Sequence, residues 1–148
     1  NAIPVVNPPR RVPEAIKSRL KSELDKMVKD RIISKVTEPT DWVNSIVVVE
    51  KPKTGKLRVC LDPKALNEAI RRPHYPSPTL DDVTSKLSGA TRFSKLDITH
   101  AYWSVKLDEE SSNLTCFGTP FGRYKYLRLP FGISSSGDMS TSIFFLYS

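Results

Sequence analysis

The chain has 148 residues, 39% of them hydrophobic, so it can bury one core of ordinary size; we expect a single domain or part of a larger one. Its longest uncharged apolar run, residues 143–147, is far shorter than the roughly 20 residues that cross a bilayer, so we expect a soluble protein with no membrane partner. The two cysteines stand in apolar runs without any Cys-x-x-Cys or Cys/His grouping, which argues against a zinc site or a disulfide framework. We predict that Cys60 and Cys116 are buried thiols.

The net charge of +7 is unevenly distributed along the chain. Residues 1–72 hold 16 Lys and Arg against 9 Asp and Glu, whereas residues 73–148 hold 7 of each kind. The excess positive charge of the first half favours a polyanionic partner, with nucleic acid as the first candidate. A basic face that is only solvated surface is the alternative reading.

The amino-terminal region contains a proline-rich segment followed by an amphipathic pattern. Pro8, Pro9 and Pro13 predict an extended run over residues 1–12, and Pro13 suits the first turn of a helix. The helix that follows has an apolar stripe at spacings of four, four and three, which predicts core packing; the stripe consists of Ile16, Leu20, Leu24 and Met27.

Two β-branched runs, residues 43–50 and 57–61, predict a β-hairpin. The segment between them is rich in lysine, and Gly55 supplies turn flexibility. The hairpin therefore carries a basic tip, formed by Lys51, Lys53, Lys56 and Arg58.

Two short helices are predicted after the hairpin. Asp62 followed by Pro63 is typical of a helix N-cap and first turn, and opens a helix that includes Asn67. Residues 72–78 contain too many prolines for regular structure and mark a subdomain boundary. Thr79 then caps a second helix, which uses Leu80, Val83 and Leu87 and ends before Gly89.

The remaining pattern favours strands. Residues 93–98 predict a strand, residues 99–102 a tight turn, and a second strand is expected through Trp103, Val105 and Leu107. Short strands are predicted near 115–118 and 124–129. Helices mixed with hairpins in this way indicate an α+β fold.

The sharpest chemical signal is Lys-Leu-Asp-Ile-Thr-His-Ala-Tyr-Trp at residues 95–103. Asp97 ends an apolar strand, where a carboxylate must be neutralised by a partner or a cation. A strand-end aspartate can hold Mg²⁺ against a substrate phosphate. An aspartate that only caps a turn is the alternative.

Two further stretches accompany this motif in a fixed order. Lys-Leu-Arg-Val-Cys-Leu-Asp-Pro-Lys-Ala-Leu-Asn precedes it at residues 56–67, and Thr-Pro-Phe-Gly-Arg-Tyr-Lys-Tyr-Leu-Arg-Leu-Pro-Phe-Gly-Ile follows at 119–133. Over roughly residues 7–135 the chain resembles the reverse transcriptases of gypsy-type LTR retrotransposons and retroviral pol polyproteins. Several spaced motifs in order are more specific than any one of them.

The resemblance implies the fingers and a partial palm of a right-hand polymerase, truncated. On this division residues 1–12 are an extended segment, 13–78 the fingers, 79–135 the partial palm and 136–148 a divergent tail. The family's motifs also imply roles for individual residues. Asp97 is implied as catalytic and as a metal ligand with the Ile98 carbonyl, Tyr102 as a steric gate against a ribose 2′-hydroxyl, Lys51 and Arg58 as a triphosphate clamp, and Phe131 and Gly132 as neighbours of the nucleotide.

Other polar residues receive weaker assignments. Asp62 and Asn67 are expected to hold the fingers together and are given no catalytic role. Arg123 and Lys125 are expected either to touch phosphate or to be exposed hairpin charges.

The resemblance also implies a reaction and its partners. The family synthesises DNA from deoxynucleoside triphosphates on an RNA or DNA template-primer, using two Mg²⁺ ions about 3.5–4 Å apart. One aspartate cannot hold both ions, and the Tyr-x-Asp-Asp hairpin that supplies the other carboxylates is not found before Ser148, so the chain alone is expected to be inactive. The rest of a pol polyprotein is expected downstream. The protein itself is expected to be intracellular, in the cytoplasm or a virus-like particle. The alternatives are a non-catalytic nucleic-acid-binding remnant of a retroelement, and an unfolded product.

Overall fold

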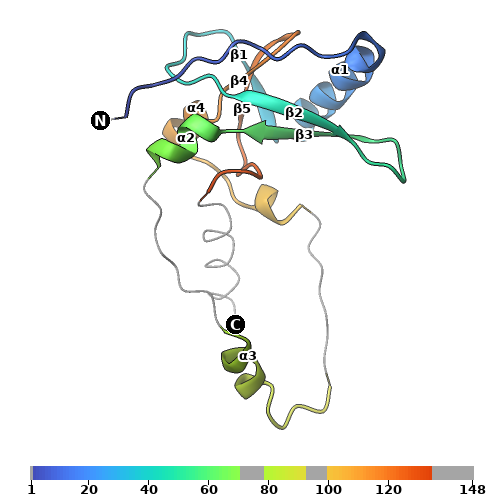
Figure 1. The fold of residues 1–148 in the computed structure, drawn as a ribbon, viewed down its shortest axis with the longest axis vertical. Helices are drawn as coiled ribbons and strands as arrows, with labels where there is room; N and C mark the ends of the chain where they lie inside the picture. The colour runs from blue at the N-terminus through green and yellow to red at the C-terminus, as the bar shows by residue number, and fades with distance from the viewer. Residues whose placement is uncertain (1, 71–78, 93–99, 135–148) are drawn as a thin grey trace.

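The computed structural model describes residues 2–70, 79–92 and 100–134 (Figure 1). Within these residues, α-helices and short β-strands mix as the sequence predicts. The helices are α1 (Glu14–Lys29), α2 (Lys64–Ala69), α3 (Leu80–Lys86), the 3-10 helix η1 (Ala101–Ser104) and α4 (Glu109–Leu114). The strands are β1 (Ile33–Val36), β2 (Ser45–Glu50), β3 (Leu57–Asp62), β4 (Phe117–Thr119) and β5 (Gly122–Tyr126).

Helix α1 confirms the predicted apolar stripe. It begins after Pro13, and it turns Leu20, Leu24 and Met27 into the core while its lysines face solvent. Full burial of a leucine side chain contributes about 1.5–3 kcal/mol, so this stripe is what holds α1 on the sheets. The helix packs against side chains of both sheets, including the stacked rings of Phe117 and Tyr124.

The strands form two antiparallel sheets. One has the order β1-β5-β4, with Ile33 opposite Tyr126, and the other is the predicted hairpin of β2 and β3. Asn44 connects the two sheets: its backbone N–H donates to the Cys116 carbonyl at 2.7 Å, and its side-chain amide donates to the Leu114 carbonyl at 2.9 Å. The two sheets and α1 therefore share one core.

Strand β1 and helix α4 were not predicted from the sequence. Strand β1 pairs with β5 although the two lie far apart in the chain, so residues from both sides of the 72–78 segment share a sheet. The predicted division of the chain at that segment stays a prediction. The predicted short strands near 115–118 and 124–129 are confirmed as β4 and β5, each displaced by a few residues.

The strand predicted through Trp103, Val105 and Leu107 is wrong. The chain instead forms η1, because His100 has left-handed backbone angles (φ 54°, ψ 48°) and its ring stacks on the ring of Trp103 with centroids 4.2 Å apart. Only one isolated antiparallel bridge follows within the described residues, between Lys106 and Arg128.

Two smaller predictions near the end of β3 also need correction. Asp62 does not cap α2, since it is the last residue of β3 and its carboxylate forms an ion pair with Arg10 from the amino-terminal segment. Cys116 is buried as predicted, but Cys60 is only half-buried because it lies on the outward face of β3.

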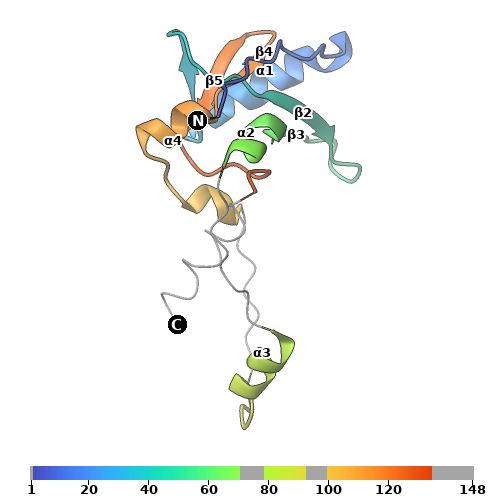
Figure 2. The same cartoon turned by 60° about the vertical axis from the view of Figure 1, so that its left-hand side comes forward.

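The amino-terminal segment is extended, as predicted, and lies along the body of the protein (Figures 1 and 2). Two backbone hydrogen bonds to Val43 hold it there. The Asn7 N–H donates to the Val43 carbonyl at 2.8 Å, and the Val43 N–H donates to the Val5 carbonyl at 3.1 Å. Helix α3 lies apart from the sheets (Figure 2). Thr79 caps α3 as predicted, whereas Leu80, Val83 and Leu87 are exposed. Among the described residues, no helix is long and apolar enough to cross a membrane.

Candidate functional site

The loop after β5 is joined to the segment that follows η1. The Leu107 N–H donates to the Leu127 carbonyl at 3.0 Å, and the Leu129 N–H donates to the Val105 carbonyl at 2.9 Å. These two hydrogen bonds flank the bridge between Lys106 and Arg128. As a result, the motif around Tyr102 and the Pro-Phe-Gly motif at 130–132 lie side by side.

Tyr102 and Phe131 meet at this junction. Their ring centroids are 5.6 Å apart with an interplanar angle of 62°, an edge-to-face arrangement that aromatic rings prefer. Phe131 is 63% exposed, while Tyr102 is half-buried. The pair therefore forms an aromatic surface that is open to solvent on one side.

Gly132 brings the loop against the end of β3. Its φ of 107° lies in a region that residues with a Cβ rarely adopt, and a Cβ built there would stand 2.9 Å from the Leu61 carbonyl oxygen. Gly132 therefore allows the loop to lie close against the backbone of the protein's own strand β3, whereas its predicted place beside the nucleotide stays a prediction.

Asn67 is the site residue that sequence reasoning assigned only to holding the fingers. From α2, its side-chain N–H donates to the Gly132 carbonyl at 2.9 Å, and its side-chain oxygen accepts from the Ser134 N–H at 2.8 Å. An asparagine has low helix propensity, so its presence inside a six-residue helix was the signal that its side chain is needed elsewhere.

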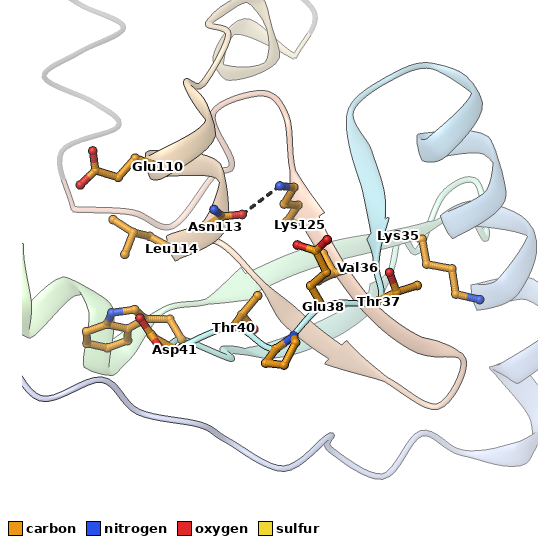
Figure 3. A pocket seen from close by; sticks show the side chains of 12 residues that line it. Lys35, Val36, Thr37, Glu38, Thr40, Asp41, Glu110, Asn113, Leu114 and Lys125 are labelled. Carbon is orange, nitrogen blue, oxygen red and sulfur yellow. Dashed lines mark hydrogen bonds between the residues drawn. The ribbon is translucent and has the colours of Figure 1, made fainter.

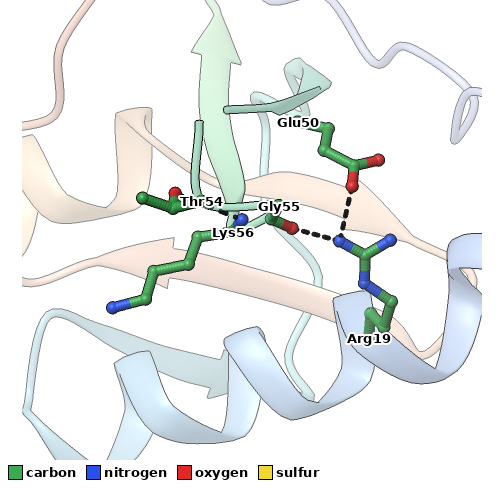
Figure 4. A network of polar contacts seen from close by, with 5 residues as sticks. All are labelled: Arg19, Glu50, Thr54, Gly55 and Lys56. Carbon is green, nitrogen blue, oxygen red and sulfur yellow. Dashed lines mark hydrogen bonds and ion pairs between the residues drawn. The ribbon is translucent and has the colours of Figure 1, made fainter. Parts of the chain in front are cut away.

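The hairpin tip that carries Lys51 is closed by its own backbone. The Lys51 N–H donates to the Lys56 carbonyl at 2.9 Å, and the Lys51 carbonyl accepts from the Gly55 N–H at 2.8 Å. Arg19 from α1 then contacts both the Glu50 carboxylate, at 3.0 Å, and the Gly55 carbonyl (Figure 4). Lys51 is exposed, and it makes no ion pair among the described residues.

Arg58 occupies the outward face of β3, opposite Val49. It is exposed and precedes Leu61 by three residues, so about 10 Å of strand separates it from the strand end that Gly132 contacts. Cys60 shares this face: burial raises the pKa of its thiol, and the positive charge of Arg58 partly opposes that shift. Arg58 is therefore an exposed cation on the outward face of β3, nearer the hairpin tip than the strand end that Gly132 contacts.

Asp97 and Ile98 lie outside the described residues, so their assigned roles stay predictions. The acidic residues Asp82 and Asp108 have structural roles: each accepts hydrogen bonds at the start of a helix, Asp82 from Thr79 and Asp108 from Ser111, and these bonds lower the pKa of each carboxyl. No group of three or more His, Cys, Asp or Glu that could hold a metal ion occurs in residues 2–70, 79–92 and 100–134.

A separate open pocket of about 540 Å³ lies between residues 35–42 and α4 (Figure 3). Of the described residues to which the sequence gives a site role or a phosphate contact, Lys125 alone lines it. Lys125, on its wall, donates to the Asn113 side chain at 2.8 Å, and Arg123 donates to the Glu38 carbonyl at 2.7 Å. Both cations are half-buried and bind groups of the protein itself, so neither is a simply exposed hairpin charge, and their contact with phosphate stays a prediction.

Comparison with known proteins places this arrangement in context. Residues 49–144 match the family model described as reverse transcriptase (RNA-dependent DNA polymerase), a match that extends into the 136–148 segment. The chain is 39% identical over 135 residues to the uncharacterized protein K02A2.6 of Caenorhabditis elegans, covering 90% of this chain and 10% of that protein. It is 29% identical over 119 residues to the retrovirus-related Pol polyprotein from transposon 297 of Drosophila melanogaster, covering 79% and 11%. The chain thus spans about a tenth of the length of these relatives.

Solved structures agree on the fold. The protease-reverse transcriptase of prototype foamy virus, in a selenomethionine-labelled mutant, matches with a TM-score of 0.79 at 20% identity, over 95% of this chain and 19% of that one. A foamy viral protease-reverse transcriptase in complex with an RNA/DNA hybrid matches with a TM-score of 0.73 at 18% identity, over 95% and 19%. Likeness at this level of identity establishes the fold.

Proposed function

Since this chain belongs to the reverse transcriptase family and has its fold, we propose that it is the fingers and partial-palm portion of an enzyme that copies an RNA or DNA template into DNA. The portion's task on this proposal is to receive the incoming deoxynucleoside triphosphate and the template strand. In the whole enzyme's reaction the primer 3′-hydroxyl attacks the α-phosphate of that triphosphate, the bond between the α- and β-phosphates breaks, and pyrophosphate leaves.

The observation that carries the proposal is the contact between Tyr102 and Phe131 at the loop that Gly132 holds against β3. A nucleotide resting on this surface would have the Tyr102 ring beside its sugar. A deoxyribose leaves room for the ring, whereas a 2′-hydroxyl clashes with it. The half-buried, packed state of Tyr102 supports this role, because a ring that is held in place discriminates better than a mobile one.

The exposed cations of the β2–β3 hairpin supply charge for the triphosphate. Lys51 and Arg58 make no ion pair among the described residues, so no carboxylate in that part of the chain competes with a phosphate for them. A guanidinium can bind two phosphate oxygens at once, and fixed positive charge stabilises the negative charge that develops in phosphoryl transfer.

Mg²⁺ remains part of the proposal through Asp97 and the Ile98 carbonyl. Oxygen donors of this kind suit Mg²⁺, which would neutralise phosphate charge and activate the primer hydroxyl. The described residues neither supply nor exclude the further carboxylates that a two-ion site requires. The steps that this chain's described residues perform are binding, orientation and sugar discrimination.

The test is nucleotide-dependent binding and extension on an RNA template. A fluorescent primer-template is titrated with the purified chain in Mg²⁺, with either the complementary or a non-complementary deoxynucleotide. We expect tighter binding with the complementary nucleotide, loss of that difference in Asp97→Asn, and no loss of template binding itself. Primer extension in the same samples, abolished by Asp97→Asn, would show that the chain itself catalyses.

The opposite result has a clear meaning. If all nucleotides give the same affinity, and binding falls steeply with salt but ignores Asp97→Asn, the chain binds nucleic acid through its basic half without selecting a nucleotide. That outcome would replace the polymerase proposal with the non-catalytic one.

A further inference from the structure

We propose that Asn67 is a positioning residue for nucleotide selection: its carboxamide fixes the loop that presents Phe131 to Tyr102, and so sets how strongly the site rejects ribonucleotides. This inference rests on the proposed function, because it deepens the role of the Tyr102 surface. Asn67 touches no reacting atom in this account and acts through the loop.

Both the N–H and the oxygen of the Asn67 carboxamide form hydrogen bonds with the same loop. The donor end binds the Gly132 carbonyl and the acceptor end binds the Ser134 N–H, so the two bonds bracket Ile133. Each bond is between neutral groups, and the side chain is partly buried, which makes the loss of either partner costly. The carboxamide fits this loop as a matched donor and acceptor.

The backbone of Asn67 is itself held in place within α2. The Asn67 backbone N–H donates to the Pro63 carbonyl at 2.8 Å, and Leu66 beside it is fully buried in the body of the protein. Helix α2 therefore offers Asn67 from a fixed position. The loop receives its orientation from the helix, since the loop has no regular secondary structure of its own.

The position of Gly132 in the loop determines where Phe131 lies relative to Tyr102. Gly132 lies close to the Leu61 carbonyl of β3, and the Gly132 carbonyl accepts a hydrogen bond from Asn67 of α2. These two contacts together fix the orientation of the Gly132 peptide. Phe131 directly precedes that peptide, and its ring lies edge-on to the Tyr102 ring. If the loop loosens, Tyr102 can move away from a 2′-hydroxyl and the discrimination falls.

Two variants separate positioning from simple folding. Asn67→Ala removes both hydrogen bonds. Asn67→Asp keeps the shape and the acceptor for Ser134, but at neutral pH its charged oxygen faces the Gly132 carbonyl and repels it. Glu68→Gln is the matched control, because Glu68 is the exposed next residue of α2.

Lowering the pH distinguishes a lost hydrogen bond from general destabilisation of the loop in Asn67→Asp. The carboxyl that Asn67→Asp introduces is again a donor and an acceptor once it is protonated, so lowering the pH towards about 4 should restore the loop in this variant alone. The other charged groups near this position are Asp62, paired with Arg10, and Lys64 and Glu68 on α2. All of them are also present in wild type and in Asn67→Ala, which serve as the reference at each pH.

The experiment has two readouts on each variant. Two-dimensional NMR follows the backbone amide signals of Gly132, Ile133 and Ser134, with a thermal melt to confirm cooperative folding. Equilibrium binding to a primer-template in Mg²⁺ gives the ratio of Kd values for the complementary ribonucleotide and deoxynucleotide. We expect the amide signals to shift and the ratio to fall by about five- to tenfold in both Asn67 variants at neutral pH, with Glu68→Gln unchanged.

Two results would overturn the inference: amide signals that do not respond to Asn67→Ala, or shifted signals with an unaltered ratio. If the wild-type chain does not distinguish complementary nucleotides at all, the proposed function fails. The NMR and its pH recovery then still decide whether Asn67 fixes the loop, so the two failures are distinguishable.

Discussion

The Tyr102 ring lies edge-on to the Phe131 ring at 5.6 Å, although Tyr102 precedes α4, β4 and β5 and Phe131 follows them. The bridge between Lys106 and Arg128 brings the two segments together, and the ring contact lies at the open end of that junction. The proposed nucleotide surface therefore depends on a contact that no local sequence pattern specifies.

A double-mutant cycle on this pair should measure its coupling. We expect Tyr102→Leu and Phe131→Leu to interact by about 0.5–1.5 kcal/mol in the free energy of unfolding, because an aromatic pair contributes this much beyond its buried area. Urea unfolding of the two single variants and the double variant gives the value. Tyr102→Phe should keep the coupling, and strictly additive effects of the leucine substitutions would contradict the ring contact.

Gly132→Ala should destabilise the protein more than Gly122→Ala. Both glycines have similar positive φ values, 107° and 114°, so both substitutions carry a backbone strain of about 1–3 kcal/mol. Only at Gly132 does the new Cβ also meet a backbone oxygen, at 2.9 Å; at Gly122 it meets the end of the flexible Lys35 side chain at 3.6 Å. The difference appears as a lower urea midpoint for Gly132→Ala, and equal midpoints would argue against the close approach.

Arg19→Ala should release the hairpin tip without unfolding the protein. The ion pair with Glu50 is exposed, and such pairs contribute about 0–1 kcal/mol, so the melting temperature should change little. The Gly55 carbonyl loses its contact with α1, and trypsin should therefore cut faster after Lys53 and Lys56. Lys21→Ala, which breaks a pair with Asp25 inside α1, is the control that should leave the cleavage rate unchanged.

The reactivity of Cys60 should report on Arg58. Burial raises the pKa of the Cys60 thiol, so the thiolate fraction at pH 8 is smaller than in a free cysteine and alkylation is slower. Because Arg58 lowers that pKa, Arg58→Ala should move the curve of alkylation rate against pH to higher pH. Lys56→Ala, at the tip, should leave the curve in place. Cys116 is fully buried, so Cys60→Ala should remove the reaction in the native protein.

Asp108 should stabilise the protein only while it is charged. Hydrogen bonds from Ser111 lower the pKa of its carboxyl below the value in the unfolded chain, so this contribution is present at neutral pH and is lost as the pH falls through the folded-state pKa. Urea unfolding at several pH values should show the difference between wild type and Asp108→Ala shrinking from pH 7 towards pH 3. A difference that is constant over this range would exclude the charged cap.

The sequence by itself determined the features that depend on neighbouring residues. The stripe of α1, the β2–β3 hairpin with its basic tip and the Thr79 cap follow from periodicity and local hydrogen bonding, and the ordered motifs indicated the family that the comparisons confirm. Asp97 and Ile98 stay predictions of that resemblance, since they lie outside the described residues.

Only the tertiary structure decided how distant segments meet. Strand β1 was not predicted because its partner β5 lies far from it in the sequence. Helix η1 forms in place of a predicted strand because His100 turns the backbone and its ring stacks on the ring of Trp103. The link from Asn67 to Gly132 has the same origin. Periodicity encodes which face of an element is apolar, whereas the choice of partner depends on packing and hydrogen bonds between residues that local patterns cannot relate.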